Sequence, residues 1–112
     1  HLSHLAEERP AQGEVLARRA FGEAQLAPTL VMGDLNDPGP AGWLDELLAT
    51  FVDASPGPHS PHTFPTSSPE RRIDYLLAST SAGVWQSAHV PCDPETLAAS
   101  DHLPVIATFR VE

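Results

Sequence analysis

The sequence has a single cysteine and no long apolar run. Cys92 has no second cysteine to pair with, so an internal disulfide is excluded, and without a basic neighbour its thiol is expected to be inert. No stretch approaches the roughly 20 apolar residues that cross a bilayer, and no signal-peptide pattern follows the first residue. The chain opens with His1 in place of Met, so we expect a partial or processed sequence. Its location in the cell is not indicated.

Several common catalytic patterns are also missing. There is no Gly-x-Ser-x-Gly, no Cys-x-x-Cys and no glycine-rich loop that would cradle phosphate, so a serine nucleophile and a nucleotide-binding fold lack support. His59 and His62 have a His-x-x-His spacing, but they stand in a proline-rich segment without a second pair of ligands. A closed zinc site needs such a pair, so we do not expect one here.

Positive charge is scarce: six Lys and Arg residues stand against 15 Asp and Glu, which gives a formal net charge of −9. An acidic chain repels phosphate backbones at long range, and this disfavours tight non-specific binding of nucleic acid. Clustered carboxylates are what a hard divalent cation requires. The plainer interpretation is surface acidity that keeps the protein soluble, and the composition leaves both open.

Apolar periodicity predicts an α/β chain that forms one domain or part of one. Helical spacing indicates amphipathic helices at residues 11–26 and 43–51. Short apolar or alternating runs predict strands at residues 29–32, 73–78, 84–90 and 105–111, with a brief edge strand at 51–53. Residues 55–70 are rich in proline and predict a surface loop.

Polar residues follow the predicted strand at 29–32, which we expect to be buried and parallel. Asp34 and Asn36 would lie at its carboxyl end, the usual place for a site in layered α/β folds. Asp34 offers an anionic oxygen to a metal or a water, and Asn36 offers an amide donor to a phosphoryl oxygen. The alternative is an Asx-turn that only caps the loop.

Two further carboxylates and an imidazole are candidates. Asp101 and His102 precede the last strand, where they offer an oxygen ligand and a group that titrates near neutrality, or else form a turn beside a surface histidine. Asp74 opens a central strand on its inward face, and a buried carboxylate there needs a partner. An imidazole could be that partner, and so could Arg71 or Arg72.

Taken in chain order, these motifs resemble the endonuclease/exonuclease/phosphatase superfamily, which includes deoxyribonuclease I-like nucleases, abasic-site endonucleases, inositol polyphosphate phosphatases and sphingomyelinases. The resemblance covers nearly the whole chain, beginning with His1 and with Arg9 and Gln12 ahead of a helix. Each motif is weak by itself, but their order is specific. The motifs are Gly33-Asp34-Leu35-Asn36, Thr63-Phe64-Pro65, Arg72-Ile73-Asp74-Tyr75-Leu76-Leu77 and Ser100-Asp101-His102-Leu103-Pro104-Val105.

The resemblance implies a two-sheet sandwich flanked by helices, as in the deoxyribonuclease I-like four-layer fold. Residues 1–112 would be the C-terminal portion of a single such domain. The implied activity is hydrolysis of a phosphate ester by direct water attack, with Mg²⁺ or Mn²⁺ as the cofactor. Asp34 would position or deprotonate the water, and Asn36 would orient it. Asp101 would hold the metal together with Asp34.

The resemblance also implies roles for two histidines. His102 would contact the scissile phosphate, with Asp74 orienting its ring, and His1 would be a second histidine that contacts the phosphate. Whether Asp34 or His102 is the general base stays open.

The N-terminal half of the family domain supplies a metal-binding Glu and an Asn near the metal, and neither motif is present in this sequence. We therefore expect the chain alone to bind metal weakly and to have little activity. It also lacks strands that would cover its sheet edges, which predicts self-association or a partner.

The leading hypothesis is an enzyme, a metal-dependent phosphohydrolase. Because the chain is acidic and has no basic stripe, a small phosphodiester or a lipid head group is favoured over duplex DNA. The choice between nuclease and phosphatase, and between endo- and exo-action, stays open. One alternative is a non-catalytic family fragment used for interaction. Another is a plain α/β domain whose motifs are only turns.

Overall fold

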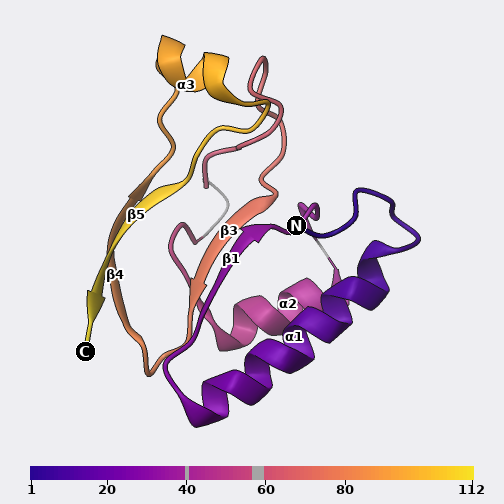
Figure 1. Cartoon of the computed structure of the whole chain (residues 1–112), viewed down its shortest axis with the longest axis vertical. Helices are drawn as coiled ribbons and strands as arrows, with labels where there is room; N and C mark the ends of the chain where they lie inside the picture. The colour runs from indigo at the N-terminus through magenta and orange to yellow at the C-terminus, as the bar shows by residue number, and fades with distance from the viewer. Residues whose placement is uncertain (40, 57–59) are drawn as a thin grey trace.

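The structure is a computed structural model that describes residues 1–39, 41–56 and 60–112. It contains two antiparallel sheets, a pair of helices packed on one of them, and a short third helix at the end of the other (Figure 1). This arrangement confirms the mixed α/β class and the two sheets flanked by helices that the sequence predicts. His59 of the His-x-x-His spacing lies outside the described residues, and His62 is exposed.

Two helices form the layer that packs on the three-stranded sheet (Figure 1). α1 (Arg9–Leu26) has a proline in its first turn, where the missing backbone N–H costs no hydrogen bond. α2 (Gly42–Thr50) lies against α1, and both helices lie close to their predicted spans. Gly13 allows the close approach, because a Cβ atom there would lie 2.2 Å from the ring of Trp43.

The three-stranded sheet has the order β1–β3–β2, with β1 at Leu30–Asp34, β3 at Asp74–Ala78 and β2 at Val52–Asp53. β1 pairs with β3 in an antiparallel register that sets Asp34 opposite Asp74. The expectation of a parallel strand is therefore wrong, because the strand next to β1 in this sheet runs the other way. The predicted edge strand is confirmed as β2.

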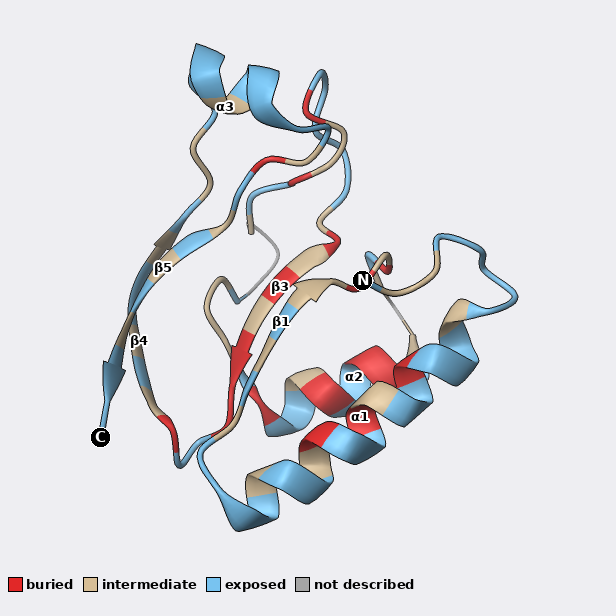
Figure 2. Cartoon of the chain, in the orientation of Figure 1, coloured by how far each residue is buried: buried red, intermediate tan, exposed pale blue. Residues whose placement is uncertain are grey.

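The core lies between the helices and this sheet, where most of the buried residues in Figure 2 are found. The core cluster is Ala17, Ala20, Leu35, Trp43, Leu44, Leu47, Phe51, Tyr75 and Leu77. Side chains alternate along a strand, so the other face of β1 points away from this core. On that face Met32 is 63% exposed. The prediction of a buried strand at 29–32 is therefore wrong, since only one face of the strand is covered.

The second sheet is a two-stranded pair of β4 (Gly83–His89) and β5 (Ile106–Val111). A register shift between Trp85 and Ser87 interrupts the regular alternation that the sequence predicts for β4. In Figure 1 this pair lies on the side of the three-stranded sheet opposite the two long helices. The predicted strands at 84–90 and 105–111 are thus confirmed, with small changes at their ends.

α3 (Pro94–Ala99) lies between β4 and β5 and was not predicted from the sequence. Asp93 caps it by accepting hydrogen bonds from the N–H groups of Glu95 and Thr96, both at 3.1 Å. Six residues are too few to show helical periodicity. The sequence signal for this helix is therefore limited to Asp93 at the N-cap and Pro94 at the first helical position. Among the described residues, no helix has both the length and the apolar character needed to cross a bilayer.

The loop between β2 and β3 is tied to the segment ahead of β5. The N–H of Leu103 donates to the carbonyl of Thr63 at 2.7 Å, and the N–H of Thr66 donates to the carbonyl of Asp101 at 2.9 Å. Phe64 also forms an isolated antiparallel bridge with Arg71. These main-chain bonds hold the residues before β5 beside the start of β3.

Candidate active site

The candidate site is built where β1 ends and β3 begins. The register places Asp34 and Asp74 opposite each other, so two carboxylates project from the same face of the sheet. Gly33 has a φ of 143°, a conformation that glycine adopts far more readily than other residues. Asn36 has a φ of 50°, in the left-handed region that Asn tolerates. The sequence Gly-Asp-Leu-Asn therefore turns the chain sharply at the end of β1.

Asp34 uses its two carboxylate oxygens differently. Oδ1 accepts a hydrogen bond from the main-chain N–H of Asn36 at 2.8 Å, which is the Asx-turn of the plainer interpretation. Oδ2 lies 3.4 Å from Nε2 of His1 and 3.6 Å from Nε2 of His102. One oxygen holds the loop while the other faces two imidazoles, so the turn does not exclude a role in chemistry.

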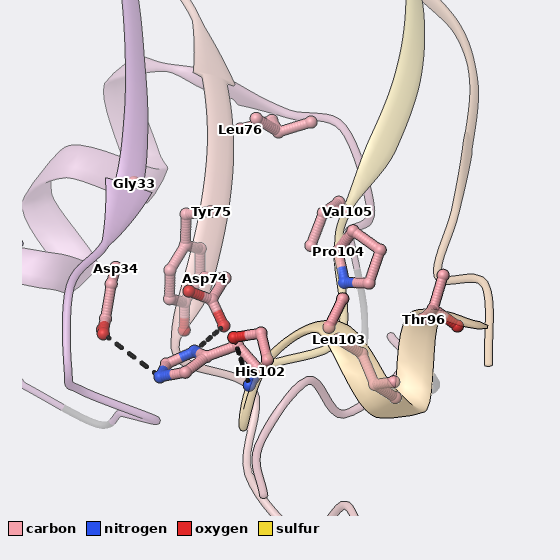
Figure 3. Close-up of a pocket in the computed structure, with 12 residues that line it drawn as sticks. Gly33, Asp34, Asp74, Tyr75, Leu76, Thr96, His102, Leu103, Pro104 and Val105 are labelled. Carbon is pink, nitrogen blue, oxygen red and sulfur yellow. Dashed lines mark hydrogen bonds and ion pairs between the residues drawn. The ribbon is translucent and has the colours of Figure 1, made fainter. Parts of the chain in front are cut away.

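His102 lies between the two carboxylates (Figure 3). Its Nδ1 is 2.8 Å from Oδ2 of Asp74, and its Nε2 faces Asp34. An acceptor at Nδ1 fixes the orientation of the ring and leaves Nε2 toward the site. The alternative pairing of Asp74 with a neighbouring arginine is wrong, because Arg72 instead binds Asp53 through bonds of 2.6 and 2.8 Å.

His1 is held at the site by main-chain contacts. The N–H of Leu2 donates to the carbonyl of Asp34 at 2.9 Å. The side-chain amide of Asn36 donates to the carbonyl of Leu2 at 2.7 Å, and the same nitrogen lies 3.3 Å from Nε2 of His1. The structure therefore brings together five of the six predicted site residues: His1, Asp34, Asn36, Asp74 and His102.

Arg9 anchors the segment that carries His1. Its Nε donates to Oδ2 of Asp37 at 3.2 Å, and its Nη1 donates to the carbonyls of Ser3 and His4 at 3.4 and 3.1 Å. Asp37 is buried, yet sequence reasoning did not identify it as a supporting residue. Its Asp-Pro-Gly context signals a turn, and nothing in it signals a partner 28 residues away.

Asp34 and His102 both have shifted pKa values. Burial raises the pKa of Asp34; the hydrogen bond from Asn36 opposes this, and the charge of Asp74 adds to it. Burial acts to lower the pKa of His102, but the hydrogen bond and charge of Asp74, with the charges of Asp34 and Asp101, outweigh it and raise that pKa. The higher pKa of His102 widens the pH range over which its ring is protonated and can donate, and the higher pKa of Asp34 makes it a stronger base than an ordinary exposed carboxylate.

Asp101 lies outside this cluster. Within the described part of the chain, the potential metal ligands whose atoms lie within 4.8 Å of one another are Asp34, Asp74 and His102. Asp101 is exposed and, with Thr66, lines a separate pocket. Its role as a metal ligand stays a prediction.

The donor set of the cluster fits part of the shell of a hard divalent cation. Carboxylate oxygens suit Mg²⁺ and Mn²⁺, whereas soft thiolate ligands are absent from the described cluster. Asp74 and His102 are bonded to each other, and Oδ2 of Asp34 faces the imidazoles of His1 and His102, so the cluster offers a cation few oxygens that are not already engaged. Because Mg²⁺ prefers an octahedral shell of oxygens, most of its ligands would come from elsewhere.

A pocket of about 360 Å³ opens beside the cluster (Figure 3). Asp34, Asp74 and His102 form its polar end. Its remaining lining is largely uncharged and includes Tyr75, Leu76, Thr96, Leu103, Pro104 and Val105. No arginine lines this pocket, so an anion bound there would depend on donors such as the His102 ring.

This chain is similar to known proteins in sequence family and in fold. A family model described as the endonuclease/exonuclease/phosphatase family matches residues 1–102. No curated protein matches the sequence significantly. Similar solved structures include a conserved, functionally unknown protein from Enterococcus faecalis V583, with 24% identity and a TM-score of 0.79. Others are an endonuclease/exonuclease/phosphatase from Bacteroides vulgatus (19%, 0.78) and the mannosyl-6-phosphatase of Bacteroides thetaiotaomicron VPI-5482 (21%, 0.75).

The three matches cover 100%, 100% and 98% of this chain, but only 48%, 48% and 49% of the respective solved chains. The chain therefore spans about half the length of these structures. At such low identity, similarity to these structures shows the fold only. The family is shown by the family model, which matches most of the sequence. The chain belongs to the endonuclease/exonuclease/phosphatase family.

Proposed function

We propose that this chain supplies part of the active site of a divalent-metal-dependent phosphoesterase, which hydrolyses a phosphodiester or phosphomonoester by direct attack of water. The observation that carries the proposal is the His102 ring held between Asp74 and Asp34. His1 and Asn36 lie against the same carboxylate. Family membership supports a phosphoesterase-type activity.

Asp34 is the residue we assign to the attacking water. Its Oδ2 accepts no main-chain hydrogen bond, and its raised pKa makes it a better proton acceptor than an ordinary carboxylate. Asn36 is fixed by its bond to Leu2, so its amide can orient a bound group without titrating. We therefore propose Asp34, and not His102, as the general base, because the His102 ring is assigned to the scissile phosphate.

His102 is assigned to the scissile phosphate. A protonated ring directs its Nε2–H away from Asp74, where it can donate to a phosphoryl oxygen and stabilise the charge that develops there. Asp74 keeps the ring in this orientation. His1 would be a second donor to the same phosphate, since its Nε2 lies 3.4 Å from the same Asp34 oxygen that His102 faces.

Bound Mg²⁺ or Mn²⁺ would supply charge neutralisation at the phosphoryl oxygens. Asp34 is one proposed ligand and Asp101 is the second, although Asp101 stands apart from the cluster. Since the chain spans about half the length of the similar structures, we propose that further ligands come from the other half of such a domain.

The proposed substrate is a small phosphodiester or a lipid head group rather than duplex DNA. The net charge of −9 opposes the approach of a polyanion, and among the described residues no lysine or arginine lines the pocket beside the cluster. A small ester presents fewer phosphates, so repulsion is weaker. The uncharged pocket lining also suits a compact organic group.

The test is hydrolysis of bis(p-nitrophenyl) phosphate with Mg²⁺ or Mn²⁺ and with EDTA, by the chain and by a longer polypeptide that contains it. We expect metal-dependent turnover that Asp34→Asn lowers by about a hundredfold or more, since general acid–base groups contribute on that order. Asp45→Asn, an exposed carboxylate on α2, is the matched control and should retain activity.

The alternative is a non-catalytic family fragment that acts as an interaction module. It predicts no turnover above the EDTA blank in either polypeptide. Equal activity of Asp34→Asn and Asp45→Asn would also contradict the proposed roles.

A further inference from the structure

We propose that Arg71 forms a second anion-binding subsite next to the catalytic cluster, so that the substrate carries another anionic group, a phosphate or a carboxylate, besides the phosphate that is hydrolysed. The inference rests on the proposed function, because it places a second contact relative to the phosphate at His102. It goes further in naming a class of substrate: small esters with two anionic ends.

Arg71 is linked to His102 through one aromatic ring. The ring of Phe64 lies 4.8 Å from the ring of His102, centre to centre, and the guanidinium carbon of Arg71 lies 4.9 Å from the same Phe64 centre. The guanidinium is therefore within about 10 Å of the His102 ring. That span suits the two ends of one small molecule.

The support for Arg71 is rigid. Phe64 and Arg71 exchange main-chain hydrogen bonds of 3.0 and 2.9 Å across their bridge. Thr63, next to Phe64, accepts from the N–H of Leu103, so the loop is also fixed to the segment that carries His102. A guanidinium stacked on a fixed aromatic ring loses less conformational freedom on binding than an arginine on an open surface.

Arg71 is also free to bind an anion. The side chain is exposed, and in the described part of the chain no carboxylate lies within ion-pair distance of it. Arg72 and Arg9, by contrast, are bound to Asp53 and Asp37. In a chain of net charge −9, an arginine left without a carboxylate partner beside the cluster is the kind of group an anionic substrate end requires.

The guanidinium group of Arg71 is planar and carries paired N–H donors. A guanidinium donates two parallel hydrogen bonds to a phosphate or a carboxylate, so either can occupy the subsite. Three matched ligands separate these sources. Trimethylene diphosphonate has two phosphonates, a phosphonobutyrate has one phosphonate and one carboxylate, and propylphosphonate has a single anionic end.

The experiment is a titration of the chain with each ligand in the presence of Mg²⁺, followed by NMR at the His102 ring and at the Arg71 side-chain N–H. We expect the ligands with two anionic ends to bind about three- to tenfold more tightly than propylphosphonate and to shift the Arg71 signal. The tighter of the two then identifies the second group as phosphate or carboxylate.

Two arginine variants decide the outcome. In Arg71→Gln the ratio of the two affinities should fall toward one, whereas Arg110→Gln, which removes an exposed arginine on β5, should keep the ratio. An unchanged ratio in Arg71→Gln would overturn the subsite but leave the proposed function standing, provided propylphosphonate still shifts His102. If propylphosphonate leaves the His102 signal unmoved, the proposed phosphate contact fails, and the subsite fails with it.

Discussion

Asp34 and Asp74 face each other across the β1–β3 ladder, and the His102 ring lies between their carboxylates. Like charges opposite each other on a sheet are destabilising, by roughly 0.2–1 kcal/mol for an ordinary pair. A protonated His102 would offset this repulsion, because its Nε2 lies 3.6 Å from Oδ2 of Asp34 and its Nδ1 lies 2.8 Å from Oδ2 of Asp74. The charge of Asp34 therefore affects the pKa of His102, and the charge of His102 affects the pKa of Asp34.

Replacing Asp74 with Asn should lower the pKa of His102. The hydrogen bond and the charge of Asp74 both raise that pKa, and burial, which lowers it, would remain. The measurement is an NMR titration of the His102 ring in the wild type and in Asp74→Asn. Asp45→Asn, a change of the same kind on the exposed side of α2, should leave the His102 titration unchanged. Coinciding curves for wild type and Asp74→Asn would contradict the assigned hydrogen bond.

The stability that His102 contributes should decrease as pH rises. Its pKa in the folded chain lies above the ordinary value, so the folded state binds the proton more tightly than the unfolded state does. The contribution is therefore complete below the ordinary pKa and is lost as pH rises through the folded one. Urea denaturation of wild type and His102→Gln across this range should show a wild-type advantage that shrinks with rising pH.

Asp34 should act in the same direction. Its folded pKa is also raised, so the free energy of unfolding falls as pH rises from the ordinary value of 3.8 through the folded pKa.

His89→Gln serves as a control for the His102→Gln comparison, because His89 is exposed on β4 and a surface change costs about 0.5 kcal/mol or less. A wild-type advantage over His102→Gln that grows with pH would contradict the assigned direction.

The residues of the site could be predicted from the sequence because each stands in a short motif. Asp34 and Asn36 follow a glycine after an apolar run, and His102 follows an aspartate ahead of a strand. The motifs do not indicate whether a strand runs parallel or antiparallel to its neighbour in the sheet. A short apolar run looks the same whether its neighbour is parallel or antiparallel, and for that reason the orientation of β1 was predicted wrongly.

The supporting residues were harder to predict because their partners are distant in sequence. Phe64 contacts the ring of His102, and Asp37 binds Arg9 across 28 residues, but neither contact leaves a local pattern. Exposure of Met32 is a further case, because an apolar residue in a strand predicts burial whatever covers the strand. Only the folded chain shows that Met32 stays exposed on one face of β1 in the part of the chain that the structure describes.

Titration with Mg²⁺ should reveal weak binding by the chain alone. The cluster offers few oxygens to a cation, because Oδ2 of Asp34 faces two imidazoles, Asp74 and His102 are bonded to each other, and Asp101 stands apart. So few oxygens would leave most of the shell to water. Calorimetry should therefore show a shallow isotherm, and Asp34→Asn should weaken it further, with Asp45→Asn as the control. Tight stoichiometric binding would contradict this expectation.

The chain should self-associate as its concentration rises. Met32 is 63% exposed on the uncovered face of β1, and Val111 of β5 is 76% exposed. Uncovered apolar strands favour association with another chain. Light scattering during gel filtration should show a mass that increases with concentration, and Met32→Glu should reduce the increase. Val15→Glu changes an exposed valine on α1 and should not. A monomeric mass at all concentrations would contradict the prediction.

Replacing Gly13 with Ala should destabilise the fold, although alanine favours a helix by about 1 kcal/mol over glycine. The added Cβ would lie 2.2 Å from the ring of Trp43, which is buried between the helices and the sheet and has little room to move. Overpacking of this kind costs about 1–3 kcal/mol, so after the gain in helix propensity we expect a net loss of up to roughly 2 kcal/mol. Gly22 lies in the same helix, and a Cβ added there would meet nothing within 4 Å, so Gly22→Ala should stabilise by up to about 1 kcal/mol. Urea denaturation of both variants distinguishes the close helix contact from helix propensity, since propensity alone would stabilise the two equally.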